Sequence, residues 1–246
     1  MKTFGLIGFP LSHSFSARYF TEKFLREGIA DCRFQLFPLE HIGGFSRLID
    51  EQSSLCGLNV TIPYKQQIIP FLHTMDAAAA EIGAVNCIAF SRTHGMLRLK
   101  GYNTDAYGFE SSLVPLLKPW HQQALIFGNG GAATAVKYVL QKLNISYRVV
   151  SRTPGDLTYG ELDRSFMESH TLLINTTPLG MHPDTEKCPD IPYQYMGEKH
   201  LAYDLIYNPA ETRFLHTAAA RGSVIKNGLE MLYLQAEKSW YIWNRE

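Results

Sequence analysis

The most specific chemical signal in the sequence is a glycine-rich loop that reads GNGGAA at residues 128–133. It has the form G-x-G-x-x-A, and the apolar pattern predicts a strand directly before it and a helix directly after it. Glycines let the backbone approach a pyrophosphate, and the free N–H groups at a helix start bind that anion. The loop therefore predicts a dinucleotide site, although a tight structural turn would also explain the glycines. The residues that we expect at this site are Gly128, Asn129, Gly130, Gly131 and Ala132.

A basic residue follows the next expected strand. That strand ends in Ser151 and is followed by Arg152 and Thr153. Sites for NAD usually place Asp or Glu here, because the carboxylate accepts a hydrogen bond from the ribose 2′-hydroxyl. A guanidinium instead suits a 2′-phosphate and cannot take over the role of the carboxylate. The three residues therefore favour NADP over NAD, and the alternative is that Arg152 is a solvated surface charge.

Two serines near the N-terminus have a spacing that suits a small anion. Ser14 and Ser16 lie two residues apart, between an expected strand and an expected helix. Their hydroxyls would converge on an anion such as a carboxylate, beside the N–H groups of the helix start. Either serine would equally serve as the N-cap of that helix. The residues by themselves leave both roles open.

The end of a polar strand carries the strongest candidate for proton transfer. In the run NVTIPYK, a period of two places Asn59 and Thr61 on one face of a strand and Val60 on the other. Open α/β sheets bind ligands at such carboxyl ends. Lys65 follows in the turn after Pro63, and a lysine beside a polar substrate can donate a proton to a developing alkoxide or stabilise it. The alternative for Lys65 is a solvated surface lysine.

Three further polar side chains could complete a site. Asn86 and Asp105 each come at the end of an apolar segment, and Asp105 could act with Lys65 as an ion pair or proton relay. For Asp105 the alternative is a helix N-cap. Gln235 shares a face with Met231 in the last expected helix. A buried glutamine needs hydrogen-bond partners, which a polar ligand, the backbone or solvent would supply.

Two runs of alternating strand and helix must position these residues. The first run has strands expected at 3–8, 32–37, 57–62, 84–90 and 96–102 and helices at 16–28, 42–51, 65–72 and 76–82. The second has strands at 123–127, 147–151, 172–175 and 201–205 and helices at 104–117, from the glycine loop to about 143, and at 229–243. Such alternation favours parallel, doubly wound sheets over an antiparallel sandwich.

Composition and charge narrow the class of protein. The chain has 246 residues, of which 46% are hydrophobic and 19% charged, which is a globular composition. Lysine plus arginine equals aspartate plus glutamate at 23 each, whereas a duplex-binding protein would carry a basic excess. No apolar run reaches the ~18 residues of a membrane span, and the N-terminal apolar stretch is too short for a signal-peptide core.

The cysteines indicate the redox state of the cellular compartment and argue against a bound metal ion. The four cysteines are scattered and lack metal-ligand spacing, so we expect no bound metal. Free thiols of this kind suggest a reducing cytoplasm. The expected partners are therefore small molecules, with neither nucleic acid nor membrane among them.

The sequence as a whole resembles the shikimate dehydrogenases of the shikimate/quinate dehydrogenase family. Nine blocks in the family's order carry the resemblance, and they are residues 8–16, 59–65, 83–86, 103–105, 128–133, 151–153, 175–181, 204–209 and 228–235. The resemblance implies reversible, NADPH-dependent reduction of 3-dehydroshikimate to shikimate, a step of the shikimate pathway toward aromatic amino acids. It also implies two α/β domains with mostly parallel sheets, the second of Rossmann type, and a deep cleft between them. The substrate-binding catalytic domain would comprise 1–103 plus 229–246, and the NADP-binding domain 104–228.

The resemblance also implies roles for the matching positions. Ser14 and Ser16 would hold the substrate carboxylate, and Lys65 with Asp105 would form the catalytic pair. Tyr207 would lie near the substrate carboxylate and the nicotinamide. The side chains that would bind ring hydroxyls or orient the substrate are Asn59, Thr61, Asn86 and Gln235. The residues that would contact the cofactor outside the glycine loop are Ser151, Arg152, Thr153, Thr176, Gly228 and Met231.

Two departures from the family pattern matter. After Ser16 the family usually continues with Pro and, a few residues on, a His-Asn pair, whereas residues 17–20 here read ARYF. Many NADP-using members also carry a second basic residue soon after the position of Arg152, whereas residues 154–156 here read PGD. We therefore expect a weaker clamp on the 2′-phosphate.

Three other functions remain compatible with the sequence. The first is a broader quinate/shikimate dehydrogenase that uses NAD, and the second is a shikimate-binding sensor without turnover. The third is a related nicotinamide enzyme that acts on a folate or a larger substrate. Lys65 and Asp105 argue against a sensor, because a pure binder needs no proton donor, and the serine pair favours a small anionic polyol. The chain is expected to act as a monomer or a homodimer.

Overall fold

The computed structural model describes residues 1–11, 14–152 and 156–245, so Thr153 lies outside the described residues. The chain divides into two compact units. Unit 1 is Met1–Thr104 with Ala236–Glu246, and unit 2 is Asp105–Gln235. Each unit is built on its own sheet, and the two sheets together contain mostly parallel strand pairs. The predicted class of two α/β domains is confirmed.

Unit 1 is built on a mixed six-stranded sheet in the order β2-β1-β3-β5-β6-β4. Its strands are β1 (Lys2–Gly8), β2 (Cys32–Pro38), β3 (Leu55–Val60), β4 (Thr74–Met75), β5 (Cys87–Thr93) and β6 (Met96–Tyr102). Its helices are α1 (Phe15–Arg26), α2 (Phe45–Glu51) and α3 (Ala77–Ile82), with 3-10 turns η1 (Ile42–Gly44) and η2 (Ile69–Phe71). Strands β1, β2 and β3 are parallel, whereas β5 is antiparallel to both β3 and β6.

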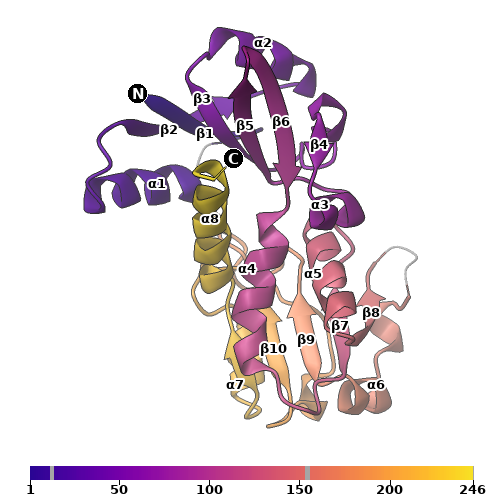
Figure 1. Ribbon diagram of the computed structural model, residues 1–246. Helices are drawn as coiled ribbons and strands as arrows, with labels where there is room; N and C mark the ends of the chain where they lie inside the picture. Colours follow the sequence, from indigo (N-terminus) through magenta and orange to yellow (C-terminus); the bar gives the residue numbers. More distant parts are fainter. Residues whose placement is uncertain (12–13, 153–155, 246) are drawn as a thin grey trace. The chain divides into compact units, whose positions relative to one another are not determined.

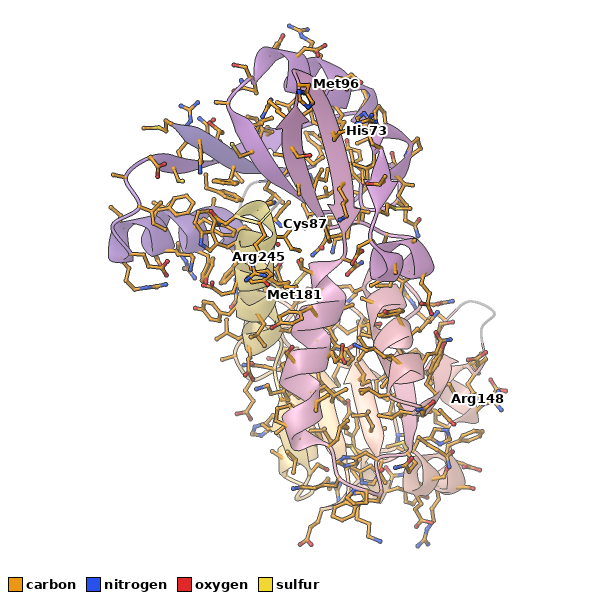
Figure 2. All side chains as sticks on the ribbon, viewed as in Figure 1. His73, Cys87, Met96, Arg148, Met181 and Arg245 are labelled. Atoms are coloured by element: carbon orange, nitrogen blue, oxygen red, sulfur yellow. The ribbon has the colours of Figure 1, made fainter. Side chains whose placement is uncertain are left out.

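Two apolar clusters cover the two faces of this sheet. Phe4 and Ile7 on β1 belong to different clusters, as expected for positions of opposite parity in a strand. The Phe4 cluster includes the ring of Trp243 from the last helix, stacked at 4.9 Å between centroids, and the buried Cys87 that Figure 2 labels. Gly57 is required beneath this ring, because a Cβ there would lie 2.3 Å from Trp243.

Unit 2 is built on a fully parallel five-stranded sheet in the order β11-β10-β9-β7-β8. Its strands are β7 (Gln123–Phe127), β8 (Ser146–Val150), β9 (Leu172–Asn175), β10 (Leu201–Asp204) and β11 (Val224–Lys226). Its helices are α4 (Thr104–Leu113), α5 (Gly131–Lys142), α6 (Arg164–Ser169), α7 (Arg213–Ala219) and the first half of α8 (Leu229–Trp243), with 3-10 turns η3 (Val114–Leu116), η4 (Tyr159–Glu161) and η5 (Tyr193–Tyr195). The strand order reverses between β7 and β9, and doubly wound sheets bind ligands at the carboxyl ends beside such a reversal.

The two helices at the unit division pack closely on each other. A Cβ on Gly108 of α4 would lie 2.4 Å from the carbonyl oxygen of Met231 on α8, so glycine permits the contact. Figure 1 shows α4 and α8 side by side. Helix α8 begins in unit 2, and its last turns pack in unit 1, where Trp243 donates its ring N–H to Ile88 O at 3.0 Å.

Some predicted elements end differently in the structure. The helix expected at 65–72 is wrong, because Pro70 has no N–H for an α-helical bond and the segment forms turns followed by η2. The strand expected at 57–62 stops at Val60, and Thr61 begins a turn in which Tyr64 N donates to Thr61 O at 2.9 Å. Short elements, namely β4, β11, α6 and α7, were not expected, since a few residues carry too little periodicity to be recognised.

No helix in the described part of the chain is both long enough and apolar enough to cross a membrane.

Candidate active site

The turn that carries Lys65 is held firmly in unit 1. Thr61 N donates to Ile7 O at 2.9 Å, which joins the ends of β3 and β1, and the carbonyl of Lys65 accepts a bond from Val85 N at 2.7 Å. The Tyr64 ring beside it is only 3% exposed and packs in the sheet core. Lys65 itself is half-buried. The backbone of the lysine is therefore fixed by neighbours on both sides.

Gly8 orients Thr61 at the same sheet edge. A Cβ on Gly8 would lie 2.4 Å from the Thr61 methyl group, so only glycine admits this close approach. The methyl group therefore packs on β1, although Thr61 lies beyond the last residue of β3. The expected strand through Thr61, which would have put this residue on one face with Asn59, is therefore wrong. The proximity of the two side chains in sequence still places both at the carboxyl end of β3.

A buried polar network surrounds the end of β3. The Asn59 amide donates to Asn86 O at 3.2 Å and to Ser239 Oγ at 3.0 Å. Thr104 lies 3.2 Å from Ser239 Oγ through its hydroxyl, and its N–H donates to Asn86 Oδ1 at 2.6 Å. All four residues are at most 4% exposed. The network joins β3, the start of β5, the start of α4 and the last helix within unit 1.

One acceptor in this network has no partner. Asn59 Oδ1 is buried and makes no hydrogen bond to any residue that the structure describes. The assignment of the amide nitrogen is fixed, because it donates to the Asn86 carbonyl, which can only accept. A buried acceptor without a donor is unfavourable by roughly 1–3 kcal/mol. A ligand hydroxyl is a donor of the right chemistry to satisfy it.

Asn86 is already engaged by the protein. Its amide nitrogen donates to Thr104 Oγ1 at 3.0 Å, and its amide oxygen accepts from the same residue. The second amide hydrogen is the part of Asn86 that remains for a ligand. Its predicted binding role therefore coexists with a structural one, which the sequence analysis did not anticipate.

The serine pair lies at the start of α1. Ser14 is the N-cap, and its hydroxyl accepts from Ala17 N at 3.3 Å, which confirms the capping alternative. Ser16 is the second residue of the helix and is half-buried. The first turn of α1 contains no acidic residue, so the positive end of the helix dipole is not neutralised there. Capping and anion binding are compatible, because a serine oxygen both accepts and donates.

Helix α1 is anchored far from these serines by a buried lysine. Lys23 is 4% exposed and donates to Glu27 at 2.8 Å and to both carboxylate oxygens of Glu237 at 2.9 Å. The Tyr19 hydroxyl donates to Glu237 as well. This charged cluster ties α1 to the middle of α8 and so holds the helix whose start carries the serines.

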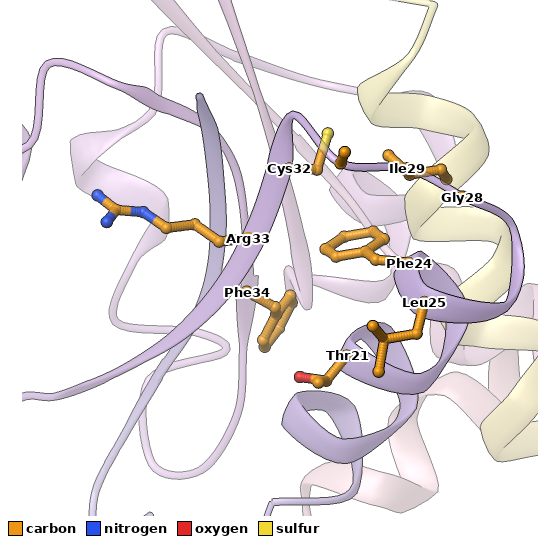
Figure 3. Close-up of a pocket in the computed structure, with 9 residues that line it drawn as sticks. Thr21, Phe24, Leu25, Gly28, Ile29, Cys32, Arg33 and Phe34 are labelled. Atoms are coloured by element: carbon orange, nitrogen blue, oxygen red, sulfur yellow. The ribbon is translucent and has the colours of Figure 1, made fainter.

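A groove on the outer side of α1 is separate from these residues. It has a volume of about 430 Å³ and lies between α1 and the edge strand β2 (Figure 3). Its walls are mostly apolar, including Phe24, Leu25 and Phe34. None of the predicted site residues lines it, and its walls do not suit an anionic polyol.

In unit 2 the glycine loop leads directly into α5. Gly128 has φ +101°, and a Cβ there would lie 2.8 Å from the Thr177 methyl group, so this position requires glycine. Gly130 is the N-cap, and no side chain caps the helix. A Cβ on Gly130 or Gly131 would have no atom within 4 Å. The uncapped helix start therefore has room for the pyrophosphate of a dinucleotide, and the loop fits that group.

The rest of the loop is held from two sides. Thr176 donates its hydroxyl to Phe127 O at 2.8 Å, and Lys137 of α5 donates to Asn129 Oδ1 at 2.6 Å. Ala132 is exposed, whereas Ala133 is buried against the sheet. Lys137 was not singled out in the sequence, and it adds a positive charge beside the loop.

A buried carboxylate organises the neighbouring strand ends. Asp204 is fully buried and accepts from Thr212 Oγ1 at 2.6 Å, Ile206 N at 3.0 Å and Asn175 Nδ2 at 3.1 Å. Burial raises the pKa of this carboxyl to about 6, and the three hydrogen bonds oppose the rise. The residue joins the ends of β9 and β10 and thereby supports Tyr207, which is 39% exposed.

The segment after β8 places Arg152 at the surface. Ser151 is buried, and its N–H donates to Leu157 O at 3.0 Å, whereas Arg152 is exposed. An exposed guanidinium at the end of the second strand of a doubly wound sheet is suited to a 2′-phosphate.

The remaining predicted residues lie along α4, α8 and the turn before α8. Asp105 is the second residue of α4, so the N-cap alternative for it is wrong. Gln235 is 7% exposed, and its amide donates to Leu232 O at 2.9 Å. Gly228 is required, because a Cβ there would lie 2.0 Å from Leu205 O. Met231 is half-buried on α8.

The structure joins two of the predicted residues by a direct contact, and Asp105 and Gln235 fall in unit 2 whereas Lys65 falls in unit 1. In unit 1 Asn59 and Asn86 are joined directly, and Ser239 is the member that the sequence analysis missed. The signal for Ser239 was available, because it lies four residues after Gln235 and so on the same side of a helix. Within the described residues, no group of three or more His, Cys, Asp or Glu side chains could hold a metal ion.

Comparison with known proteins gives one consistent result. The family model described as the shikimate dehydrogenase substrate binding domain matches residues 6–88. Shikimate dehydrogenase (NADP(+)) from Desulforamulus reducens is 35% identical over 267 residues, covering 97% of this chain and 88% of that protein.

Solved structures agree over nearly the full length. A chorismate mutase/shikimate 5-dehydrogenase fusion protein from Clostridium acetobutylicum is 34% identical, with a TM-score of 0.86 over 99% of this chain and 91% of that one. Shikimate 5-dehydrogenase from Thermus thermophilus, solved with NADP(H) and shikimate, is 29% identical, with a TM-score of 0.82 over 99% of this chain and 93% of that one. The chain therefore belongs to the shikimate dehydrogenase family.

Proposed function

We propose that this protein catalyses the reversible, NADPH-dependent reduction of 3-dehydroshikimate to shikimate, a step toward the aromatic amino acids. The observation that carries the proposal is the position of Lys65 in a chain of this family. The lysine lies in the turn after β3, its backbone is held by neighbours on both sides, and a buried amide network surrounds the end of the same strand. Ketone reduction needs a cation or proton donor at the carbonyl oxygen. Lys65 is the residue that we assign to this task.

Lys65 and Asp105 are proposed as the catalytic pair. NADPH, when bound, supplies the hydride. Negative charge then develops on the carbonyl oxygen of the substrate, and the Lys65 ammonium stabilises that charge and delivers the proton. Asp105 orients the ammonium toward the carbonyl oxygen. In the reverse direction, the neutral amine of Lys65 accepts the proton of the alcohol.

The substrate is proposed to bind in two ways: amide side chains bind its ring hydroxyls, and two serines bind its carboxylate. Ser14 and Ser16 hold the carboxylate at the positive start of α1. The unpartnered Asn59 Oδ1 accepts from a ring hydroxyl. The other side chains that orient the ring are Thr61, Asn86, Tyr207 and Gln235. These contacts favour a small anionic polyol over a folate.

The cofactor is proposed to bind at the carboxyl edge of the parallel sheet. The loop at 128–132 and the uncapped start of α5 take the pyrophosphate, which their open backbone fits. Ser151, Arg152 and Thr153 hold the adenosine ribose and its 2′-phosphate. Thr176 supports the loop, and Gly228 and Met231 contact the nicotinamide. Residues 1–103 with 229–246 form the substrate domain in this proposal, and 104–228 form the NADP domain.

The location and assembly are also proposals. All four cysteines are free thiols, a state that a reducing cytoplasm maintains. The enzyme is proposed to act there as a monomer or homodimer.

The test is a crossed assay of purified protein. Nicotinamide reduction is measured with shikimate or quinate, each combined with NADP or NAD, for the wild type and for Arg152→Gln. A strong rate with shikimate and NADP alone, and a loss of NADP preference in the variant, supports the proposal. Comparable rates with quinate or NAD favour the broader dehydrogenase. Shikimate binding without turnover in every combination favours a sensor, and the absence of shikimate binding favours the folate-type alternative.

A further inference from the structure

The segment after β8 folds back onto its own strand. Leu157 N donates to Val149 O at 3.1 Å, and Leu157 O accepts from Ser151 N at 3.0 Å, which adds a short parallel bridge beside Val150. The apolar side chain of Leu157 packs against the core of unit 2. These contacts fix the position of the next turn, η4, whose first residue is Tyr159.

The turn itself is stabilised by a capping box. The carboxylate of Glu161 accepts from the N–H of Thr158 at 2.6 Å and from its hydroxyl at 2.7 Å. Thr158 and Glu161 are exposed, but the closed pair of bonds defines the backbone on both sides of Tyr159. A side chain on such a turn is held in place before any ligand arrives.

Tyr159 is linked to both parts of the cofactor site proposed in unit 2, by a ring contact to one and by electrostatics to the other. Its ring stacks on Phe127 with centroids 6.3 Å apart and planes 26° apart, and Phe127 directly precedes Gly128 of the glycine loop. Arg152 is close enough to act on it electrostatically. Burial raises the pKa of Tyr159, and the positive charge of Arg152 lowers it by a smaller amount. The phenol and the guanidinium are therefore within electrostatic range of each other, and the bridge between Val150 and Leu157 places the segment that carries Tyr159 beside the end of β8.

The Tyr159 hydroxyl is available to a ligand. Among the described residues it makes no hydrogen bond. Other tyrosines of unit 2 behave differently: the Tyr193 hydroxyl donates to Pro189 O, and the Tyr203 hydroxyl is 2.7 Å from Ser112 Oγ. A half-buried phenol with no partner has unused donor capacity.

A 2′-phosphate needs more donors than Arg152 alone provides. Residues 154–156 supply no second cation, and the Asp156 carboxylate is bound to Val149 N at 2.9 Å. A phosphate dianion is best held by several charge-assisted hydrogen bonds. A neutral hydroxyl beside the guanidinium adds one such bond without adding a charge.

We propose that Tyr159 is a specificity-determining residue for NADP, donating a hydrogen bond to the 2′-phosphate beside Arg152. This inference rests on the proposed function, in which that cofactor binds at the carboxyl edge of the sheet. In this chain Tyr159 takes the place of the second basic residue that the segment after Arg152 lacks. It distinguishes NADP from NAD by completing the phosphate contact only when the phosphate is present.

The test uses nucleotide fragments and needs no turnover. Binding of 2′,5′-ADP and of 5′-AMP is measured by calorimetry for the wild type, for Tyr159→Phe and for the control Tyr147→Phe. The control removes a hydroxyl from β8 whose hydrogen-bond partner is Gln141. We expect Tyr159→Phe to weaken 2′,5′-ADP by about tenfold or more, because a hydrogen bond to a charged group is lost. Its affinity for 5′-AMP and its melting temperature should match the wild type.

The outcomes separate the inference from the function. Equal loss of 2′,5′-ADP and 5′-AMP affinity in Tyr159→Phe would mean that the ring has a structural or adenine-stacking role, and the inference would be wrong. Unchanged binding of both would also overturn it. If the wild type itself fails to prefer 2′,5′-ADP over 5′-AMP, the NADP assignment fails together with the inference. Arg152→Gln serves as the positive control, since it should abolish the preference even if Tyr159 plays no part.

Discussion

The two units present their candidate residues in opposite ways. In unit 1 they are side chains in a buried network, and Asn59, Asn86 and Ser239 are at most 4% exposed. In unit 2 the loop at 129–132 is exposed backbone with open space where side chains would be. A polyol is recognised by specific donors and acceptors, whereas a pyrophosphate is recognised by N–H groups that every residue has.

This difference has a consequence for mutation. Removal of one member of a buried network leaves its partners unsatisfied, so binding and stability change together. A side chain introduced into an exposed loop blocks the ligand there and leaves the stability of the folded chain almost unchanged. Variants of the buried network in unit 1 should therefore change binding and stability together, whereas variants of the exposed loop in unit 2 should change binding alone.

Lys65→Ala should have the largest effect. The rate should fall at least ~10³-fold, or about 4 kcal/mol, mainly in kcat, because the proposed proton donor is lost. The control is Lys187→Ala, an exposed lysine paired with Asp184 in unit 2. Steady-state kinetics with shikimate and NADP check the result. Full activity in Lys65→Ala would remove this residue from the mechanism.

Asp204 should make the free energy of unfolding depend on pH. A typical carboxylate, whose pKa falls on folding, makes a protein more stable as pH rises, and Asp204 should do the opposite. Its pKa rises from 3.8 in the unfolded chain to about 6 in the folded one, so folding favours the protonated form. Stability should therefore fall as pH rises through this range, by about 3 kcal/mol in total. Denaturant unfolding of the wild type and Asp204→Asn, at about pH 4.5 and about pH 7.5, measures the effect as a difference. A pH-independent difference would contradict it.

Two glycines of the same loop should behave differently. Gly128→Ala introduces a clash at a positive φ and should destabilise the protein by about 2 kcal/mol. Gly130→Ala meets no atom within 4 Å, and it should change stability by less than about 1 kcal/mol. It should nevertheless weaken NADP binding by about tenfold or more, because the methyl group occupies the anion site. Thermal unfolding and calorimetric titration separate the two effects. Normal NADP binding by a folded Gly130→Ala would place the cofactor elsewhere.

Ser239→Ala should have the smallest effect on activity of the variants considered, although Ser239 lies in the buried network. Asn59 and Thr104 each lose a partner, which should lower the free energy of unfolding by about 1 kcal/mol. The KM for shikimate should rise because Asn59 is less well fixed, while kcat changes less. Ser169→Ala, an exposed helical serine bonded to Ser165 O, is the matched control. Equal behaviour of the two variants would show that the network has no role in binding.

The sequence predicted the long elements of the fold well. Strand β7 and helix α8 have the bounds that periodicity gave them, since a buried strand of five residues and a helix of four turns carry clear patterns. The helix expected at 65–72 failed at Pro70, and β4 and β11 were missed. Their few residues are held by strand neighbours distant in sequence, and no local pattern records such pairing.

The candidate site shows the same limit at the level of residues. The glycine loop and Lys65 were found because their residue types and spacing fit one chemistry. Ser239, Lys137 and Tyr159 were not found, because a serine, a lysine or a tyrosine acquires meaning only from its neighbours. The contacts of Ser239 with Asn59 and of Tyr159 with Phe127 join positions far apart in the chain.

The sequence by itself determined the class of two α/β domains, the dinucleotide loop and the proton-donor candidate. Each of these depends on local order: apolar periodicity, glycine at a turn, and a lysine after a strand. The tertiary structure alone decided which polar groups are satisfied and which are left over. It engaged both ends of the Asn86 amide, left Asn59 Oδ1 without a donor among the described residues, and placed Tyr159 within electrostatic range of Arg152. Hydrogen bonding and burial are properties of neighbours in space, so they appear only when the chain has folded.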